Sequence, residues 1–543
     1  MQKVPPQLII ILTAALLFMH SLGKAPLFDW DEINFAESAR EMIETGNYMQ
    51  VQVNYEPFWE KPPFYFWMTA ASMKVFGVNE FAARFPNAVC GIVTLLVIFS
   101  IGRRLHDRRF AAWWTLIHAG SFLPNLYFQS GIIDPWFNFF IFLGIYFLSG
   151  FLSSPDTGKI PLPNLLLSAL FTGMAVLTKG PVGLLVVLLT YFVFLVLNRW
   201  KGWVPVRYYL IWGAGVLAVT MLWFGLEILQ HGWWFVNEFV TYQIRLAKTK
   251  DAGHGGFLLY HFVVLLIGCF PASLLIFNAG SKSDDRRVFI FRKMMLASLI
   301  VILVVFTLVR TKIVHYSSFT YFPIGYLAAS LAYGLKDGGM VLRRWQQTGL
   351  LIIGIIWSII FTGLPLLGNN IHWLKPLLQK DAFALANLGA DVTWGYHMMI
   401  PGILFLLAVV AAYIAMRRGL TEKALILLFV SCIAIMQFAI SSIAPRIEKY
   451  SQHAAIEFFQ SLKGQDVYAD TYGYKSYAPY FYSAVRPGNR KESRDDKWLM
   501  TGPVDKPTYL VIRINKKDQI LKEHGDKVTV LYEKNGFVFL RRK

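Results

Sequence analysis

The segment QTGLLIIGIIWSIIFTGLPLL, residues 347–367, contains no charged side chain. About 20 apolar residues are enough for a helix to cross the hydrocarbon core of a bilayer. Similar runs recur along most of the chain, and they give thirteen candidate spans, at residues 6–23, 86–102, 111–128, 133–151, 163–178, 180–198, 207–226, 257–277, 291–309, 316–334, 347–367, 396–415 and 423–441. Because lipid offers the backbone no hydrogen bonds, these runs predict an α-helical polytopic membrane protein.

The composition supports this prediction. Hydrophobic residues make up 55% of the 543 residues and charged residues only 16%, where soluble proteins carry about 25% charged residues. The chain has 52 Lys and Arg against 33 Asp and Glu, a formal charge of +19. In a soluble protein this excess would suggest nucleic-acid binding, but membrane proteins concentrate basic residues in their cytoplasmic loops. The three cysteines lie in apolar segments and predict neither a disulfide framework nor a cysteine metal site.

Basic residues also predict the orientation. With a cytoplasmic N-terminus, every inside loop carries Lys or Arg, and the outside loops are poorer in basic residues for their length. An odd number of spans then places the C-terminal region outside. The first run, residues 6–23, is interpreted as a retained helix, because no convincing signal-peptide cleavage site follows it.

We therefore predict two domains. Residues 1–444 form the membrane domain, whose outer loop, residues 24–85, holds a helix near Ile33–Glu44 and an interfacial helix at Phe64–Phe76. Residues 445–543 form a soluble α/β domain on the outside. Its expected elements are an amphipathic helix at Glu448–Leu462, strands at Asp466–Tyr472, Tyr509–Ile514, Val528–Tyr532 and Phe537–Leu540, and a mobile loop at Arg486–Lys497.

Ionisable residues gather at the outside ends of the spans. A transporter more often places such groups near the middle of the membrane. This arrangement suits chemistry on a lipid head group at the outer leaflet. The residues concerned are Asp31, Glu32, Glu60, Lys61, Asp134, Lys179, His254, Lys312 and His315.

Several strings in this layer resemble one family of glycosyltransferases. They are Trp30-Asp31-Glu32, Ala39-Arg40-Glu41-Met42, Gly46-Asn47-Tyr48, Glu60-Lys61-Pro62-Pro63-Phe64-Tyr65-Phe66-Trp67, Thr178-Lys179-Gly180-Pro181 and Lys312-Ile313-Val314-His315-Tyr316. The membrane portion thereby resembles the family that contains the bacterial lipid A aminoarabinose transferases and is related to the protein O-mannosyltransferases. The C-terminal domain resembles theirs by position and size only. Asn34-Phe35 stand where this family often has Arg-Tyr.

The resemblance implies a C-type glycosyltransferase fold and a polyprenyl-phosphate-linked sugar as the donor. It also implies a bacterial cytoplasmic membrane, with the active site and the C-terminal domain in the periplasm. Inversion at an anomeric carbon needs a carboxylate near the acceptor. The polyprenyl phosphate leaves as an anion, so a cation is expected opposite it.

We assign the catalytic carboxylates to Asp31, Asp134 and Glu32. Asp31 is the first choice for the acceptor side, although Asp is also a preferred helix N-cap. Asp134 precedes Pro135, so it either caps a helix or supports the catalytic acid. Glu32 is either a site residue or a first-turn helix charge.

Lys61, Lys179 and Lys312 are the candidates for binding the donor phosphate. Lysines at this depth can also extend along the apolar surface to the head groups without a catalytic role. Lys179 lies in a short Thr-Lys-Gly-Pro turn between two apolar runs, which favours a function for its charge.

The resemblance further implies a zinc ion, or another divalent metal, with Glu60 and His254 among its ligands. Zinc usually takes three or four ligands. Where the family has a C-terminal histidine, this sequence offers Tyr472, Tyr474 and Tyr477. Metal binding is thus an expectation that two ligands alone do not establish.

The function expected from these observations is inverting transfer of a sugar from a polyprenyl phosphate to a lipid A-like acceptor. A protein hydroxyl as the acceptor is an alternative. From other classes, a transporter of a lipid-linked sugar or a non-catalytic scaffold would also account for a polytopic chain. No nucleic-acid partner is expected.

Overall fold

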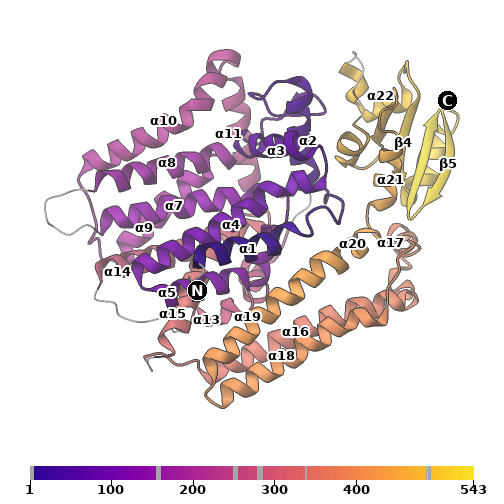
Figure 1. The fold of residues 1–543 in the computed structure, drawn as a ribbon. Helices are drawn as coiled ribbons and strands as arrows, with labels where there is room; N and C mark the ends of the chain where they lie inside the picture. Colours follow the sequence, from indigo (N-terminus) through magenta and orange to yellow (C-terminus); the bar gives the residue numbers. More distant parts are fainter. Residues whose placement is uncertain are drawn as a thin grey trace.

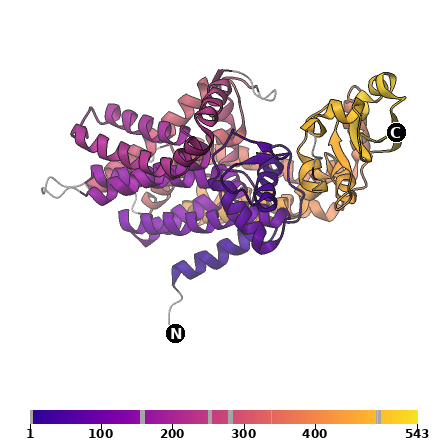
Figure 2. The ribbon, with the colours of Figure 1, turned by 90° about the horizontal axis from the view of Figure 1, so that it is seen from above.

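The computed structural model describes residues 5–153, 161–248, 255–277, 285–336, 339–484, 486 and 491–543. Long helices lie side by side in one bundle, and the last hundred residues form a unit at one end of it (Figures 1 and 2). By length and composition, eight helices among the described residues can cross a membrane. They are Glu80–Leu105, Asp134–Leu152, Leu162–Lys179, Val206–His231, Arg286–Leu308, Arg344–Asn369, Tyr396–Arg417 and Thr421–Glu448.

In Figure 1 the first six of these helices are α4, α7, α8, α10, α14 and α16. The last two spans, Tyr396–Arg417 and Thr421–Glu448, each combine regular α-helix with a short irregular helix. The first holds η5 (Tyr396–Met399) and α18 (Ile400–Arg417), and the second holds α19 (Thr421–Phe438), η6 (Ala439–Ile443) and α20 (Ala444–Glu448). Two shorter apolar helices, α1 (Pro6–Met19) and α9 (Val182–Leu197), lie in the same bundle.

Three of the predicted spans are not continuous helices. The span expected at 111–128 consists of α5 (Arg108–Ala119) and α6 (Phe122–Tyr127), and the one at 257–277 consists of α12 (Tyr260–Gly268) and α13 (Ala272–Leu275). The third, at 316–334, is a 3-10 segment, η2 (Val314–Thr320), followed by α15 (Tyr321–Gly334). Pro271 lies at the second break and has no N–H to continue a helix.

The outer loop forms the two helices that the sequence predicts. They are α2 (Asp31–Thr45) and α3 (Phe64–Phe76), with the short strands β1 (Gln52–Val53) and β2 (Glu56–Pro57) between them. Gly46 ends α2 with a φ of +71°, a left-handed conformation that favours glycine.

Helix α2 is buried on two sides. Phe35 and Met42 pack against a cluster that includes Tyr65 of α3, whereas Ile33 and Ala36 pack against residues of the C-terminal region. Every residue from Glu32 to Met42 is buried. Helix α2 therefore forms a layer between the membrane bundle and the C-terminal region.

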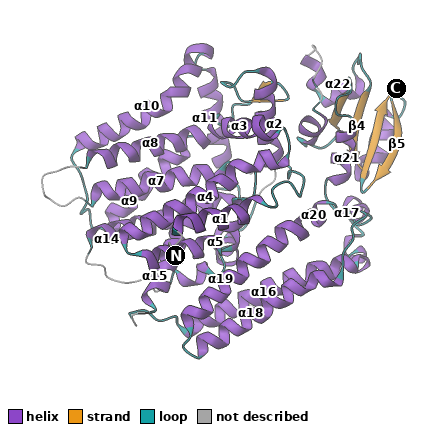
Figure 3. Ribbon diagram, viewed as in Figure 1, coloured by secondary structure: helices purple, strands orange, loops and turns teal. Residues whose placement is uncertain are grey.

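The C-terminal region carries a four-stranded sheet of order β3-β4-β6-β5 (Figure 3). Strand β3 is parallel to β4, and the β4–β6 and β5–β6 pairs are antiparallel. Asn535 and Gly536 join β5 to β6 with positive φ at both residues, as a tight hairpin turn requires. The four predicted strands are thus confirmed, with bounds Tyr468–Thr471, Thr508–Arg513, Val528–Lys534 and Phe537–Arg542.

Two predictions about this region need correction. The helix expected at Glu448–Leu462 is split, because α20 ends at Glu448 and α21 spans His453–Ser461. The stretch 486–497, expected to be a mobile loop, contains η8 (Lys491–Arg494) and the start of α22 (Asp496–Thr501), while residues 487–490 lie outside the described residues. The remaining elements are α11 (Trp234–Lys248), α17 (Ala382–Asn387), α23 (Lys517–His524), η3 (Ile371–Trp373), η4 (Lys375–Leu378), η7 (Pro479–Ser483) and η9 (Ile514–Lys516).

Candidate active site

The N-terminus of α2 presents Asp31 at the outer end of the bundle. Trp30 is the residue that caps the helix, and Asp31 is its first helical residue, with no side-chain capping bond. Asp31 therefore does not cap α2, which was the alternative to a role in the active site. The Asp31 side chain is 37% exposed, and its Oδ2 atom lies 3.6 Å from Nε2 of His315 on η2.

Glu32 is turned into the protein. Nε and Nη2 of Arg84 on α4 donate to its two oxygens at 3.1 and 2.7 Å, and the backbone N–H groups of Phe28 and Gly131 donate as well. Burial acts to raise the pKa of Glu32, but the charge and hydrogen bonds of Arg84 outweigh it, so the pKa is lowered. This carboxylate is a structural anion for the acidic turn, and our assignment of Glu32 to catalysis is not supported.

Lys179 and Asp134 form an ion pair between α8 and α7, with Nζ 2.6 Å from Oδ1. Asp134 does not cap α7, because Ile133 is the capping residue and no side-chain capping bond is made. Lys179 ends α8, and Gly180 turns the chain with a φ of +101°. A Cβ atom at Gly180 would come within 2.5 Å of the Phe239 ring on α11, so this turn requires glycine.

Lys61 belongs to the same group of charges. Its Nζ atom lies 5.1 Å from the ring centroid of Tyr242 on α11, a cation–π distance. Burial lowers the pKa of Lys61, and four neighbouring charges also act on it. They are Glu60, Lys179, Asp31 and Asp134. The structure therefore brings together Asp31, Lys61, Asp134 and Lys179, which are far apart in the sequence.

Lys312 has a different role from the one expected. Its Nζ atom donates to the carbonyls of Phe306 and Thr307, at 2.6 and 2.9 Å. These carbonyls belong to the last turn of α14, whose end leaves acceptors without helical partners. Lys312 is thus a C-terminal cap for α14 in this structure, which favours a structural role over the predicted binding of the donor phosphate.

Three aromatic residues of the site, Phe137, Tyr242 and Tyr316, were not assigned roles from the sequence, and His315 was considered only as a substitute metal ligand, together with His261. Nζ of Lys179 lies 5.6 Å from the ring centroids of both Phe137 and Tyr316. His315 and Tyr316 belong to the string 312–316, which resembles the glycosyltransferase family. Within that string the sequence analysis assigned donor-phosphate binding to Lys312. Sequence spacing gave no signal for Phe137 or for Tyr242 on α11.

The expected metal ligands are not assembled among the described residues. Glu60 is described, but His254 lies outside the described residues. Across the described part of the chain, no three His, Cys, Asp or Glu side chains come together as a metal site. Tyr474 is one of the residues at the place of the expected third ligand. The Arg513 guanidinium lies over its ring, with Cζ 4.6 Å from the ring centroid. The expectation of a metal bound by Glu60 and His254 therefore stays a prediction.

The C-terminal region reaches the acidic turn next to Asp31. The backbone N–H of Tyr477 donates to Asp29 Oδ1 at 3.3 Å, and the Tyr477 ring meets Trp30 edge-on at 5.2 Å. Nζ of Lys475 lies 5.0 Å from the Trp30 ring centroid. Burial raises the pKa of Asp29. Asp29 therefore joins the two parts of the chain, and Asp31 lies beside this junction.

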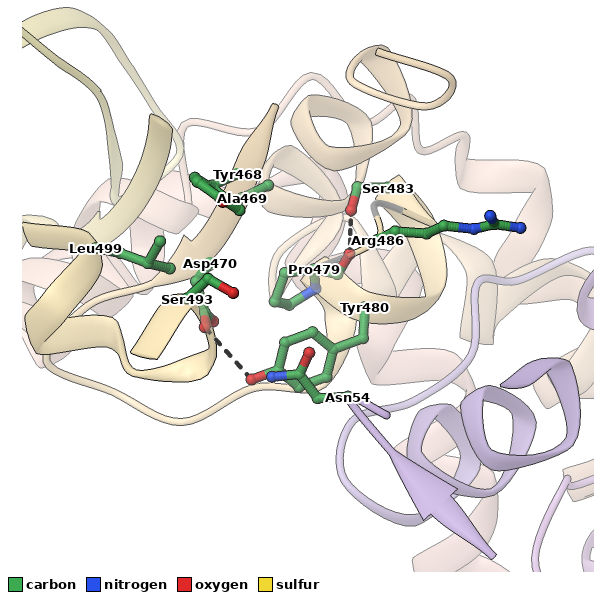
Figure 4. Close-up of a pocket in the computed structure, with 10 residues that line it drawn as sticks. All are labelled: Asn54, Tyr468, Ala469, Asp470, Pro479, Tyr480, Ser483, Arg486, Ser493 and Leu499. Atoms are coloured by element: carbon green, nitrogen blue, oxygen red, sulfur yellow. Dashed lines mark hydrogen bonds between the residues drawn. The ribbon is translucent and has the colours of Figure 1, made fainter. Parts of the chain in front are cut away.

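A separate pocket lies where Asn54 of the outer loop meets the C-terminal region (Figure 4). Asp470 lines it, accepts a bond from Tyr480 at 3.4 Å, and has its pKa raised to about 7 by burial. None of the predicted site residues lines this pocket. The pocket therefore lies between the outer loop and the C-terminal region, apart from the cluster of Asp31, Lys61, Asp134 and Lys179.

Comparison with known proteins identifies similar chains. The family described as dolichyl-phosphate-mannose-protein mannosyltransferase matches residues 60–224. An uncharacterized protein of Aquifex aeolicus is 26% identical over 239 residues, which cover 44% of each chain. The undecaprenyl phosphate-alpha-4-amino-4-deoxy-L-arabinose arabinosyl transferase of Shewanella sediminis is 24% identical over 433 residues, covering 75% of this chain and 76% of that protein.

A solved structure shares the fold. The crystal structure of ArnT from Cupriavidus metallidurans bound to undecaprenyl phosphate superposes with a TM-score of 0.76 at 19% identity. The match covers 98% of this chain and 97% of that one. At this identity the likeness establishes the architecture, which is that of the whole chain rather than of the membrane bundle alone.

Proposed function

We propose that this chain transfers a sugar from a polyprenyl phosphate to a lipid A-like acceptor. Its similarity to the membrane glycosyltransferases, which include the lipid A aminoarabinose transferases and are related to the protein O-mannosyltransferases, supports this proposal. The reaction takes place at the outer face of a bacterial cytoplasmic membrane. Polyprenyl phosphate is the donor lipid, as the relatives' names and the bound undecaprenyl phosphate of the structural neighbour support.

The observation that carries the proposal is the convergence of two cations and two carboxylates at the outer end of the bundle. Lys61 and Lys179 supply positive charge, and Asp31 supplies an accessible carboxylate on the neighbouring helix α2. A single site therefore offers both groups that the reaction needs, one for the leaving phosphate and one for the nucleophile.

The proposed reaction is a displacement at the anomeric carbon. An acceptor oxygen attacks that carbon, and the bond from the carbon to the phosphate oxygen breaks. The polyprenyl phosphate leaves with the bonding electron pair, and Lys61 and Lys179 stabilise the charge that develops on it. If the acceptor is a hydroxyl, Asp31 takes its proton; if it is already an anion, Asp31 orients it. Attack from the face opposite the leaving group inverts the anomeric centre.

Asp134 has a supporting role in this scheme. It holds Lys179 by an ion pair. Phe137 and Tyr316 surround the same ammonium group. A lysine held in this way keeps its position when the phosphate arrives, so less side-chain entropy is lost on binding.

A protein hydroxyl is the competing acceptor, because the family profile that matches residues 60–224 is named for protein mannosyltransferases. Mass spectrometry of lipid A and of surface glycoproteins from a deletion strain separates the two. Loss of a sugar from lipid A supports our proposal, and loss from glycoproteins supports the alternative.

The enzyme assignment is tested with washed vesicles and a radiolabelled polyprenyl-phosphate sugar. Covalent transfer to the acceptor is expected, whereas movement across the membrane without transfer would indicate a transporter. Asp31→Asn should lower transfer at least about a hundredfold, the scale expected for loss of a general base, with donor binding retained. Asp518→Asn, an exposed acid of α23, is the matched control. Wild-type turnover in the Asp31→Asn variant would refute the role of Asp31.

A further inference from the structure

One contact in the site is not used by the reaction described above. Nε2 of His315 lies 3.6 Å from Oδ2 of Asp31, and the two side chains are 21% and 37% exposed. The distance is longer than a hydrogen bond, but catalytic hydrogen bonds are often long before the substrates arrive. The imidazole therefore lies next to the carboxylate proposed to receive or orient the nucleophile.

The backbone that carries His315 is fixed to the helix that carries Asp134. The Ser318 hydroxyl donates to the His315 carbonyl at 2.5 Å, and Asn138 Nδ2 donates to the Ser318 oxygen at 2.8 Å. Asn138 lies on α7, one turn beyond Asp134. The next residue, Tyr316, places its ring near Lys179. One short segment, η2, thus contacts both the acceptor-side acid and the donor-side lysine.

Four charged side chains from different elements act on the His315 imidazole. They are Asp31 on α2, Lys61 in the outer loop, Asp134 on α7 and Lys179 on α8. Burial is the largest effect and lowers the pKa of His315. A neutral imidazole carries one N–H and can donate it to a carboxylate. A packing role alone would not require a nitrogen opposite the Asp31 oxygen.

We propose that His315 is a positioning residue for Asp31: its Nε2–H donates to Oδ2 of the carboxylate and holds the other oxygen toward the acceptor. This inference rests on the proposed function, because it assigns a partner to the acceptor-side acid of that reaction. The hydrogen bond occupies one carboxylate oxygen of Asp31 and leaves the other as an acceptor. The same bond fixes the rotamer of the Asp31 side chain, because a hydrogen bond from a neighbouring residue restricts its rotation.

The test compares three substitutions of His315. The side-chain nitrogen of glutamine in His315→Gln reaches about as far as Nε2 and can donate, while His315→Asn carries the same amide on a shorter side chain. His315→Phe keeps a ring but has no donor. His397→Phe, an exposed histidine outside the site, is the matched control.

The His315→Phe and His315→Asn variants should lose about 10- to 100-fold in kcat, the value of one hydrogen bond to a charged group. Their KM for the donor should stay within about twofold, since the phosphate contacts are untouched. The His315→Gln variant should recover most of the loss.

Three results would overturn the inference: unchanged kcat in the Phe and Asn variants, a Gln variant no better than Asn, or a loss that appears only in the donor KM. The two amide variants are polar and similar in volume, so a folding defect in the Phe variant does not prevent the comparison. Failure of the proposed function gives a different result, because the wild-type protein itself would then transfer no sugar.

Discussion

Asp134 pairs with Lys179, one of the two lysines proposed to bind the donor phosphate: its Oδ1 atom lies 2.6 Å from Nζ of Lys179. The pair joins the start of α7 to the end of α8, with the Asp134 side chain buried and the Lys179 side chain 18% exposed. A phosphate that binds Lys179 must therefore share it with a carboxylate. This gives Asp134 a measurable effect on donor affinity.

Replacing Asp134 by Asn should tighten donor binding. The change removes a negative charge near the phosphate and keeps an oxygen that accepts a bond from Lys179. We expect the donor Kd to fall about tenfold, about 1.4 kcal/mol, within the range of one charge–charge interaction near a protein surface. Equilibrium binding of the labelled donor measures it. An unchanged or weaker affinity would contradict the arrangement, and Asp518→Asn is again the control.

The three lysines should separate into two classes. Lys61→Met and Lys179→Met remove a charge from the phosphate site, so we expect donor KM to rise and transfer to slow, with acceptor dependence changed much less. Lys312→Met removes a helix cap, so it should lower thermal stability and leave donor kinetics near wild type. Steady-state kinetics with donor and acceptor varied separately provides the test. Donor kinetics that change only in Lys312→Met would reverse the assignment.

The buried Glu32–Arg84 pair should control stability rather than chemistry. Arg84→Met leaves a buried carboxylate without its cation, which costs about 3–5 kcal/mol. We expect a large fall in the thermal unfolding midpoint in detergent, and Glu32→Gln should also be destabilising. Glu80→Gln, a first-turn acid of α4, is the control. Midpoints equal to that of the control would mean that the pair does not hold the acidic turn.

The junction between α20 and α21 should depend on pH. His453 lies 2.9 Å from the buried Glu448 and 3.3 Å from Glu457. These contacts raise the pKa of His453, with Glu448 as the largest cause, while burial and Lys449 act against the rise. The stabilisation is therefore complete below the unfolded pKa of about 6.5 and is lost as pH rises through the higher folded value.

Because the imidazole is partly exposed, we expect the pH effect on stability to be about 1 kcal/mol. Thermal unfolding at pH 6 and pH 9 measures it. His453→Gln should lower the midpoint at pH 6 and remove the difference between the two pH values, while His397→Gln should do neither. A pH dependence that persists in His453→Gln would assign the effect to another group.

The sequence predicted the helical class, the outer-loop helices and the four C-terminal strands, because each depends on local periodicity and turn residues. The resemblance to the glycosyltransferase family is confirmed by the family profile and by the aminoarabinose transferase relatives. The predicted spans at 111–128, 257–277 and 316–334 were wrong as continuous helices, because hydropathy measures burial and not the backbone hydrogen bonds that break at Pro271 and within η2.

The sequence predicted that the site residues lie at the same end of the bundle, but it did not predict which of them contact each other. Asp31, Lys61, Asp134 and Lys179 share one end of the bundle, as topology requires. The roles of Glu32 and Lys312 were not predictable, because each depends on a partner distant in sequence or on the exact end of a helix. Arg84 lies 52 residues from Glu32, and no spacing rule connects them.

The burial of α2 between the bundle and the C-terminal region has a consequence for biosynthesis. The helix that carries Asp31 is synthesised within the first tenth of translation, yet the C-terminal residues that pack with its Ile33 and Ala36 belong to the last hundred. Until those residues are translocated, that face is open to water and Asp29 lacks the Tyr477 N–H. We therefore expect a C-terminally truncated chain to lack this cover on α2 and to transfer sugar more slowly than the full chain.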